Sequence, residues 1–557
     1  MANVLLVTYS GYIKTPSSLA LDNGLANLAG ALIDAGHVAQ ILDLNTLSTL
    51  RLLTPHGFFD LAKLLNKGSD RSVAVKRIQT IFDEHQEHEL NTLFEQIVTA
   101  ITVLHIDVIG FKCWGSEGSV AIKNWLALIR ASFPEIKILL GGPVCQVMPE
   151  HAARYFSNFD FMALGEAEKT IVGIIDHIEK NTPITTVPGL LYKNNGVFKK
   201  TAPDPFTDLN QLPRPRYDRH VYPSAWTGDK LNMVVLDESR GCPNRCHFCV
   251  HPTYAFNRRT KSVSRLLEEI KQIQATLGTV HFRMAGSNTP GKYIHEFSKA
   301  VLEQQIDLKF SCFAHVEDFE VQSLSMLHKA GLRSIFFGIE TADEALSKKV
   351  CNKAVSSDKA EQVIKNASSA GIFCTGSFIY PLPFQMQNPE SRAKTFDFIK
   401  RVFGNNPHAS AQFLNPFPLP NTKWWTEKEK FGFEFDEDEY LLRNISIVAR
   451  HMFPPEMQDF LPYKLDGKSH FELATELSTL MNELVPHGVA FNISDDVALI
   501  GIGCDESPIQ FRNEMMPAFL YGGVDRVSMM VEKFNRATKT QPFFTDAVSK
   551  TTNQFLI

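Results

Sequence analysis

The sequence has 557 residues, enough for about two to four domains, and a formal net charge of −5. This charge argues against sequence-independent binding of nucleic acid, which needs a surplus of Lys and Arg facing the phosphates. Nine cysteines are too few for a disulfide scaffold, and their odd number favours a reducing compartment. No run of ~18 apolar residues predicts a membrane span, and the N-terminus has the pattern of a β-strand instead of a signal peptide. We therefore expect a cytoplasmic α/β protein.

The first 180 residues alternate between strand and helix patterns. Short apolar runs predict strands at residues 4–7, 40–42, 107–112, 136–140 and 161–164. Apolar residues at helical spacing predict helices between them, and residues 46–103 have the pattern of a helical insertion. Because parallel strands need crossover connections, this alternation predicts a doubly wound, Rossmann-like sheet over residues 1–180.

A hairpin and a proline-rich linker are predicted for residues 181–225, since Asn195-Gly196 lies between two apolar runs. A second alternation covers residues 226–425, with strands predicted at 233–236, 280–284, 308–313, 334–339, 373–379 and 409–414. Six β/α units in series predict a partial or full TIM-type barrel, with its site at the carboxyl ends of the strands. Residues 426–557 lack a clear period, and we expect a mixed α/β or helical cap that contributes to the substrate site.

The sharpest motif is RGCPNRCHFC, in which Cys242, Cys246 and Cys249 are spaced C-x3-C-x2-C. Three thiolates on a tight loop can bind three irons of a [4Fe–4S] cluster and leave the fourth iron open to a small molecule. Two alternatives remain at this point. A zinc site would have to recruit His247 or His251, because no second cysteine pair lies nearby. Alternatively, the three cysteines are merely buried.

This loop resembles that of the radical S-adenosylmethionine (SAM) enzymes, with Phe248 at the aromatic position before the last cysteine. The segments around GIETADEALSKKV, GSFIYPLP and NPFPLPNT resemble the later strand ends of that family. The resemblance implies SAM bound to the open iron, an adenosyl radical, and an external electron donor of the flavodoxin or ferredoxin type. It further implies SAM contacts from Phe248, Ser287, Glu340 and Pro383, although Glu340 could instead be a helix-capping or ion-paired carboxylate.

Two departures from that family pattern concern the SAM contacts. The second barrel strand ends in Met284-Ala285-Gly286-Ser287-Asn288, where relatives often carry an acidic residue. The third strand carries His315, where relatives commonly have arginine.

The segments ILLGGPVCQVMPEH and FDFMALGEAEKT resemble the cobalamin-binding domain that precedes many radical SAM domains. The resemblance covers about residues 1–425 and implies a set of cobalamin-contacting residues. An alternative is a sheet that has lost its cofactor or binds a nucleotide. The D-x-H-x-x-G motif is absent, so we expect cobalamin to bind with its own base displaced and without a histidine below cobalt. The implied contacts are Ser10, Gly11, Gly141, Gly142, Pro143, Gly165 and Glu166.

The function implied by these resemblances is a cobalamin-dependent radical SAM enzyme that methylates an unactivated carbon of a small molecule or natural-product precursor. One alternative is a cyclase, ring-contracting or oxidative rearrangement enzyme with the same cofactors. The other is a non-enzymatic cobalamin or iron–sulfur sensor. No catalytic acid or base can be named from the sequence, and neither nucleic acid nor membrane is expected as a partner.

Overall fold

Two sheets organise the computed structural model, which describes residues 1–58, 71–204, 207–255, 257–447 and 459–536. The first sheet has seven strands, of which five are parallel and the last two form an antiparallel hairpin. The predicted hairpin therefore extends the sheet instead of standing apart from it. In spatial order the strands are β2 (Val38–Asp43), β1 (Asn3–Thr8), β3 (Val108–Lys112), β4 (Lys137–Gly141), β5 (Phe161–Ala163), β6 (Leu190–Asn194) and β7 (Val197–Lys200).

Helices cover both faces of this sheet because its strands alternate the direction of their apolar side chains. Val4 and Leu6 pack with α1 (Asn23–Asp34) and α8 (Glu168–Lys180) on one face. Leu5 and Val7 belong to the cluster on the other face. The helices on that second face are α2 (Leu47–Leu53), α4 (Arg71–Val103), α5 (Ser116–Ser132), α6 (Pro143–Val147) and α7 (Pro149–Phe156). The predicted insertion thus consists of α2 and α4, and residues 59–70 lie outside the described chain.

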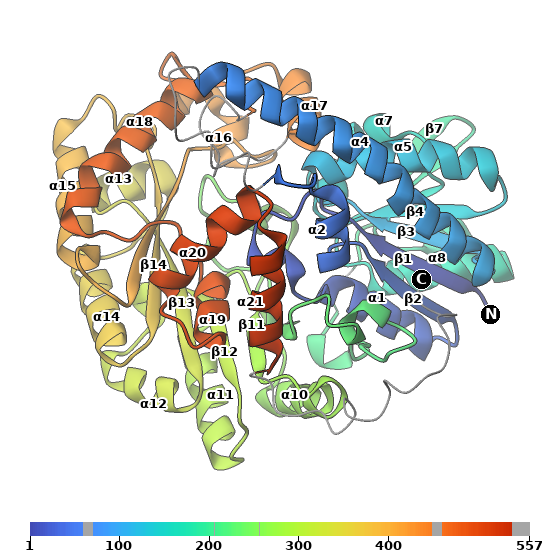
Figure 1. Ribbon diagram of the computed structural model, residues 1–557, viewed down its shortest axis with the longest axis horizontal. Coiled ribbons are helices and arrows are strands. Elements are labelled where there is room, and N and C mark those ends of the chain that lie inside the picture. Colours follow the sequence, from blue (N-terminus) through green and yellow to red (C-terminus); the bar gives the residue numbers. More distant parts are fainter. Residues whose placement is uncertain (59–70, 205–206, 256, 448–458, 537–557) are drawn as a thin grey trace.

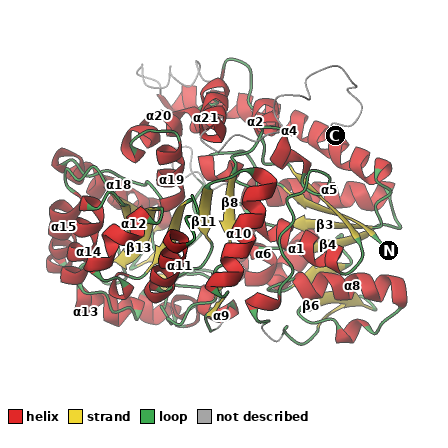
Figure 2. Ribbon diagram, turned by 90° about the horizontal axis from the view of Figure 1, so that it is seen from below, coloured by secondary structure: helices red, strands yellow, loops and turns green. Residues whose placement is uncertain are grey.

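The second sheet has six parallel strands and stays open, because its first and last strands do not pair. The partial barrel expected from the sequence is therefore confirmed, and full closure is not seen. In chain order the strands are β8 (Met233–Leu236), β11 (His281–Met284), β12 (Lys309–Ala314), β13 (Leu332–Glu340), β14 (Phe373–Ile379) and β15 (Ala409–Leu414). The helices between them are α10 (Val263–Leu277), α11 (Gly291–Glu303), α12 (Leu324–Lys329), α14 (Ser357–Ser369) and α15 (Pro389–Phe403). Figure 2 shows both sheets flanked by these helices.

The C-terminal region divides between the two ends of the barrel. Residues 423–447 and 459–484 contain α16 (Lys423–Thr426), α17 (Glu437–Ser446), α18 (His470–Leu484) and the short strands β16 (Phe433–Glu434), β17 (Lys464–Leu465) and β18 (Lys468–Ser469). After them come α19 (Asp495–Gly503), α20 (Pro508–Leu520) and α21 (Val524–Arg536), drawn in red in Figure 1.

Helix α19 closes the amino end of the barrel. Its first residue, Asp495, is fully buried and accepts hydrogen bonds from Arg283 Nε (3.0 Å) and Ser311 Oγ (2.8 Å). Both donors stand third in their strands, and the far end of α19 packs near His281, the first residue of β11. The cysteine loop follows the carboxyl end of β8. Helix α19 therefore lies at the opposite end of the barrel from this loop, and a contribution of the C-terminal region to the substrate site stays a prediction.

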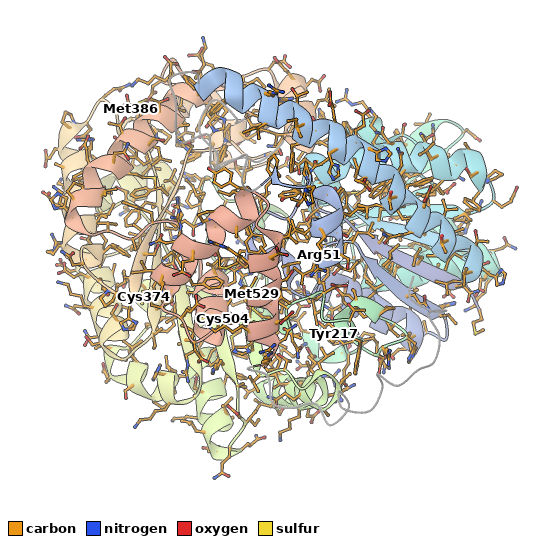
Figure 3. The ribbon with its side chains drawn as sticks, viewed as in Figure 1. Arg51, Tyr217, Cys374, Met386, Cys504 and Met529 are labelled. Atoms are coloured by element: carbon orange, nitrogen blue, oxygen red, sulfur yellow. The ribbon has the colours of Figure 1, made fainter. Side chains whose placement is uncertain are left out.

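The two sheets are also joined through these C-terminal helices. Arg51 of α2, labelled in Figure 3, donates a hydrogen bond to Ser528 Oγ of α21 (2.8 Å). None of the described helices is long and apolar enough to cross a membrane.

Candidate functional site

The cysteine loop is clamped at both ends by a two-residue antiparallel pair. Strand β9 (Ser239–Arg240) enters the loop and pairs with β10 (Arg259–Thr260), which leaves it. Gly241 sits between β9 and the first cysteine with φ +86°, and a Cβ there would lie 2.5 Å from the carbonyl oxygen of Asn257. Only glycine fits this position. The loop is therefore held at the carboxyl end of β8, where a barrel places its reactive groups.

The three thiols suit a multi-iron cluster better than a single ion. Cys242 is buried, and Cys246 and Cys249 are half-buried. Burial raises the pKa of Cys246 to about 11 and that of Cys249 to about 12, so both are protonated thiols until metal displaces the proton. Among the described residues, no three His, Cys, Asp or Glu side chains converge closely enough to hold one metal ion. In a [4Fe–4S] cluster each thiolate binds a different iron, which needs wider spacing.

The two histidines of the zinc alternative have other partners. The His247 ring lies 3.2 Å from the carbonyl oxygen of Val350, and the His251 ring is hydrogen-bonded to Ser287 Oγ (3.1 Å). The zinc alternative therefore has no support in the geometry.

Three of the four SAM candidates lie around this loop. Phe248 packs on Trp424 with ring centroids 5.6 Å apart, and Ser287 contacts the loop through His251. Glu340 ends β13 with a left-handed φ of +66° and is ion-paired to Lys353 (2.7 Å), as one of the alternatives proposed. Pro383 is buried in the turn after β14.

Lys353 is a site residue that the sequence did not single out. Its Nζ crosses directly over Gly338, where a Cβ would lie 2.4 Å away. Burial by itself would lower the pKa of Lys353, but the charge of Glu340, followed by the influence of Cys246 when its thiol ionises, outweighs burial and raises that pKa. A cation is thus held between the end of β13 and the cysteine loop.

An acidic residue, Glu238, lies between β8 and β9 and contacts the loop after β11. Glu238 is fully buried and accepts hydrogen bonds from Thr289 Oγ1 (2.6 Å) and the backbone amide of Gly286 (3.1 Å). Burial raises the pKa of this carboxyl. Glu238 therefore braces the loop after β11 from beneath, and Gly286 is required because a Cβ would lie 2.2 Å from Glu238 Oε1.

A cavity of about 210 Å³ opens at the carboxyl edge of the first sheet, between the strand ends and helices α1 and α8. Its walls are mainly apolar, with Leu6, Leu25 and Leu139 among them. The glycine Gly110, in the middle of β3, leaves room within it. Such a slot fits the flat, apolar part of a cobalamin tail. Four of the seven cobalamin candidates line it, namely Gly141, Gly142, Gly165 and Glu166.

The other three cobalamin candidates do not line this cavity. Ser10 is turned toward Asn45, whose side-chain oxygen accepts from its hydroxyl (2.7 Å). Gly11 lies against Glu117 of α5, and Pro143 begins α6. The loop after β1 is therefore drawn toward the other face of the sheet. Two histidines elsewhere in the first sheet's domain, His105 and His151, could in principle bind cobalt from below. Neither lines the cavity, and His151 is paired with Asp438.

Trp114 is a second residue that the sequence did not single out. It follows β3, is 45% exposed, and donates from its indole Nε1 to Thr8 Oγ1 at the end of β1 (3.3 Å). Lys112 Nζ lies 4.1 Å from the ring centroid. The strand order reverses between β1 and β3, and ligands of open α/β sheets bind at such a switch point. An exposed aromatic residue directly after a strand was the available signal.

Arg240 joins the cavity to the cysteine loop. It lines the cavity, stands two residues before Cys242, and pairs with Glu166 (3.1 Å), Glu168 (2.7 Å) and Asp237 (2.8 Å). Arg259 of β10 also pairs with Glu166. Burial opposes the charge on Glu166, but both arginines outweigh it and lower its pKa. A largely buried ion-pair network, with side chains 9–20% exposed, thus ties the loop after β5 to the start of the cysteine loop.

Comparisons with known proteins agree with this arrangement. Residues 239–399 match the Radical SAM superfamily, and residues 74–175 match the B12 binding domain. An uncharacterized methyltransferase of Pyrococcus horikoshii is 26% identical over 60% of this chain and 71% of its own length. An anaerobic magnesium-protoporphyrin IX monomethyl ester cyclase of Synechocystis is 25% identical (60% and 67%). A cytidylyl-2-hydroxyethylphosphonate methyltransferase of Streptomyces wedmorensis is 22% identical (63% and 71%).

Solved structures share the whole fold. The radical SAM methyltransferase TsrM from Kitasatospora setae, with cobalamin and a [4Fe–4S] cluster bound, matches with a TM-score of 0.63 and 14% identity. That match covers 96% of this chain and 99% of TsrM. The cobalamin-dependent enzyme OxsB, with aqua-cobalamin and SAM bound, matches with a TM-score of 0.56 and 14% identity, over 95% and 72% of the two chains. The chain therefore carries a radical SAM domain preceded by a B12-binding domain.

Proposed function

We propose that this enzyme transfers a methyl group to an unactivated carbon of a small-molecule substrate. The observation that carries the proposal is the Arg240 network, which holds the cavity and the cysteine loop side by side. When bound, cobalamin supplies the methyl group, and the cluster with SAM supplies the radical that activates the substrate carbon. Two of the relatives reported above are named methyltransferases, which supports the same reaction class.

The contribution of the chain's own residues is placement. Cys242, Cys246 and Cys249 would hold the cluster, and Glu238 stiffens the neighbouring loop that carries Ser287. Gly141, Gly142, Gly165 and Glu166 would hold cobalamin from the strand ends, with Trp114 beside it. Holding the cluster and cobalamin next to one substrate replaces several separate collisions by a single reaction in a fixed orientation. We further propose that residues 1–180 with the β6–β7 hairpin are the cobalamin unit and that 226–425 form the SAM unit.

A cyclase or rearrangement reaction is the second candidate, because one of the relatives is named as a cyclase. A non-enzymatic sensor has no such support, since the relatives reported above are all named as enzymes.

The deciding experiment is anaerobic reconstitution with iron, sulfide and cobalamin, followed by incubation with dithionite as the reductant, SAM bearing a trideuterated methyl group, and a panel of substrates. Methyl transfer predicts a product that carries the trideuterated methyl. A product that lacks the label but gains a ring would favour the cyclase, and absence of 5′-deoxyadenosine in every mixture would rule out the proposed radical step.

A further inference from the structure

The outer side of the cysteine loop belongs to a continuous surface made of three segments, which we call the basic face: residues 244–247, 347–352 and 423–431. Backbone contacts join them. The amide of His247 donates to the carbonyl oxygen of Cys351 (2.9 Å), and the amide of Trp424 donates to that of His247 (3.1 Å). Trp424 Nε1 donates to the Val350 carbonyl oxygen (3.0 Å). Asn352 Nδ2 donates to the Arg245 carbonyl oxygen (2.9 Å). The cysteine loop is therefore part of this surface.

The basic face has the opposite charge to the protein as a whole. Its three segments contain six Lys or Arg residues and only two Glu, in a chain whose net charge is −5. Lys423 and Lys430, which share Glu427, are 57% and 71% exposed. The exposed side chains of Arg245, Lys348 and Lys349 have no ion-pair partner among the residues that the structure describes. Positive charge is thus concentrated, and partly uncompensated, around the loop.

We propose that the basic face is the docking surface for an acidic one-electron carrier protein that holds a flavin or an iron–sulfur centre. In this step the carrier loses one electron, and the cluster gains it and passes from the 2+ to the 1+ state. The inference rests on the cluster assigned to the cysteine loop and does not depend on the identity of the methylated product.

Charge and placement both support such a partner. Half-buried His247 stands next to Cys246 in the sequence, so the backbone that carries a ligand reaches the basic face itself. Electron-transfer complexes have small interfaces and are short-lived. Their formation depends on opposite charges that steer the two proteins together, and less on a large apolar interface. Within the three segments the acidic side chains are outnumbered, and Glu427 is engaged by two lysines. Lys428 is paired with Glu437 of α17 (3.3 Å), so the uncompensated charge is that of Arg245, Lys348 and Lys349.

The test uses the full-length enzyme reconstituted with its cluster and a bacterial flavodoxin reduced to the hydroquinone. Stopped-flow bleaching of the cluster's visible absorbance measures the rate of electron delivery. The double variant Lys348→Glu/Lys349→Glu should lower the second-order rate constant at least about tenfold at low ionic strength, and the deficit should shrink at high salt. Reduction by dithionite should proceed at the wild-type rate, because a small reductant needs no docking surface.

The matched control is Lys271→Glu/Lys299→Glu, which makes the same charge change on the outer helices α10 and α11 and should behave as wild type. Three results would overturn the proposal. They are an unchanged flavodoxin rate in the Lys348/Lys349 variant, an equal loss in the control variant, and an equal slowing of dithionite reduction, which would indicate damage to the cluster. None of these readouts depends on methyl transfer.

Discussion

Replacing Arg240 by glutamine should weaken the connection between the cavity of the first sheet and the cysteine loop. The substitution keeps a polar side chain of similar reach but removes the charge that Glu166, Glu168 and Asp237 share. Glu166 retains Arg259, and Asp237 retains amide donors from Asn23 and Asn27. Glu168, only 9% exposed in its side chain, loses the one ion-pair partner it has among the described residues.

The expected cost is about 3 kcal/mol in the free energy of unfolding, the lower end for removing one partner of a buried ion pair. We use the lower end because the other two carboxylates keep partners. Because Arg240 is part of the cavity wall, cobalamin affinity should also fall about tenfold, or ~1.4 kcal/mol. Urea unfolding measures the first quantity, and titration of the apoprotein with hydroxocobalamin by visible absorbance measures the second.

The control is Arg214→Gln. Arg214 pairs with Glu268 at 2.9 Å, but the two side chains are 34% and 61% exposed, so its removal should cost less than about 1 kcal/mol. If Arg240→Gln were no more costly than Arg214→Gln and bound cobalamin normally, the network would not connect the two sites as argued.

Four further predictions follow from individual residues. Alanine at Cys242, Cys246 or Cys249 should remove most iron–sulfur absorbance, whereas Cys504→Ala, at the end of α19 (Figure 3), should leave the iron content unchanged. Gly141→Leu should fold, since a Cβ there meets only Ala163 at 3.8 Å, but it should block the cavity and abolish cobalamin binding in the same titration; normal binding would contradict the cavity assignment. We expect cobalamin to bind with its own base displaced from cobalt, so electron paramagnetic resonance of bound cob(II)alamin should show no nitrogen splitting below cobalt, because no histidine lines the cavity to take the place of that base. Burial lowers the pKa of His281 to about 3, so the folded state resists protonation; stability should fall as pH drops below the ordinary value of 6.5, by about 2 kcal/mol at pH 5. His281→Phe should remove this pH dependence of the free energy of unfolding, as measured by urea unfolding at pH 5 and at a pH above 6.5.

Short-range patterns in the sequence determined much of this molecule. All six barrel strands were predicted within two residues of their ends, because apolar runs between helical segments are a local signal. The cysteine motif was equally local, since its spacing and neighbouring glycine are confined to ten residues. The open iron–sulfur loop and the glycine-rich strand ends after β4 and β5 therefore followed from the sequence and its resemblances.

Only the tertiary structure decided how distant segments meet. The loop with Ser10 and Gly11 turns away from the cavity because Glu117, more than 100 residues later, hydrogen-bonds the Tyr12 amide. Arg240 meets Glu166 and Glu168 across more than 70 residues, and Glu238 accepts a hydrogen bond from the amide of Gly286, 48 residues later. Likewise, α19 lies at the amino end of the barrel, where Asp495 accepts hydrogen bonds from Arg283 and Ser311. Such pairings depend on the arrangement of whole helices and strands. The sequence around one residue of a pair does not indicate which distant residue it will contact.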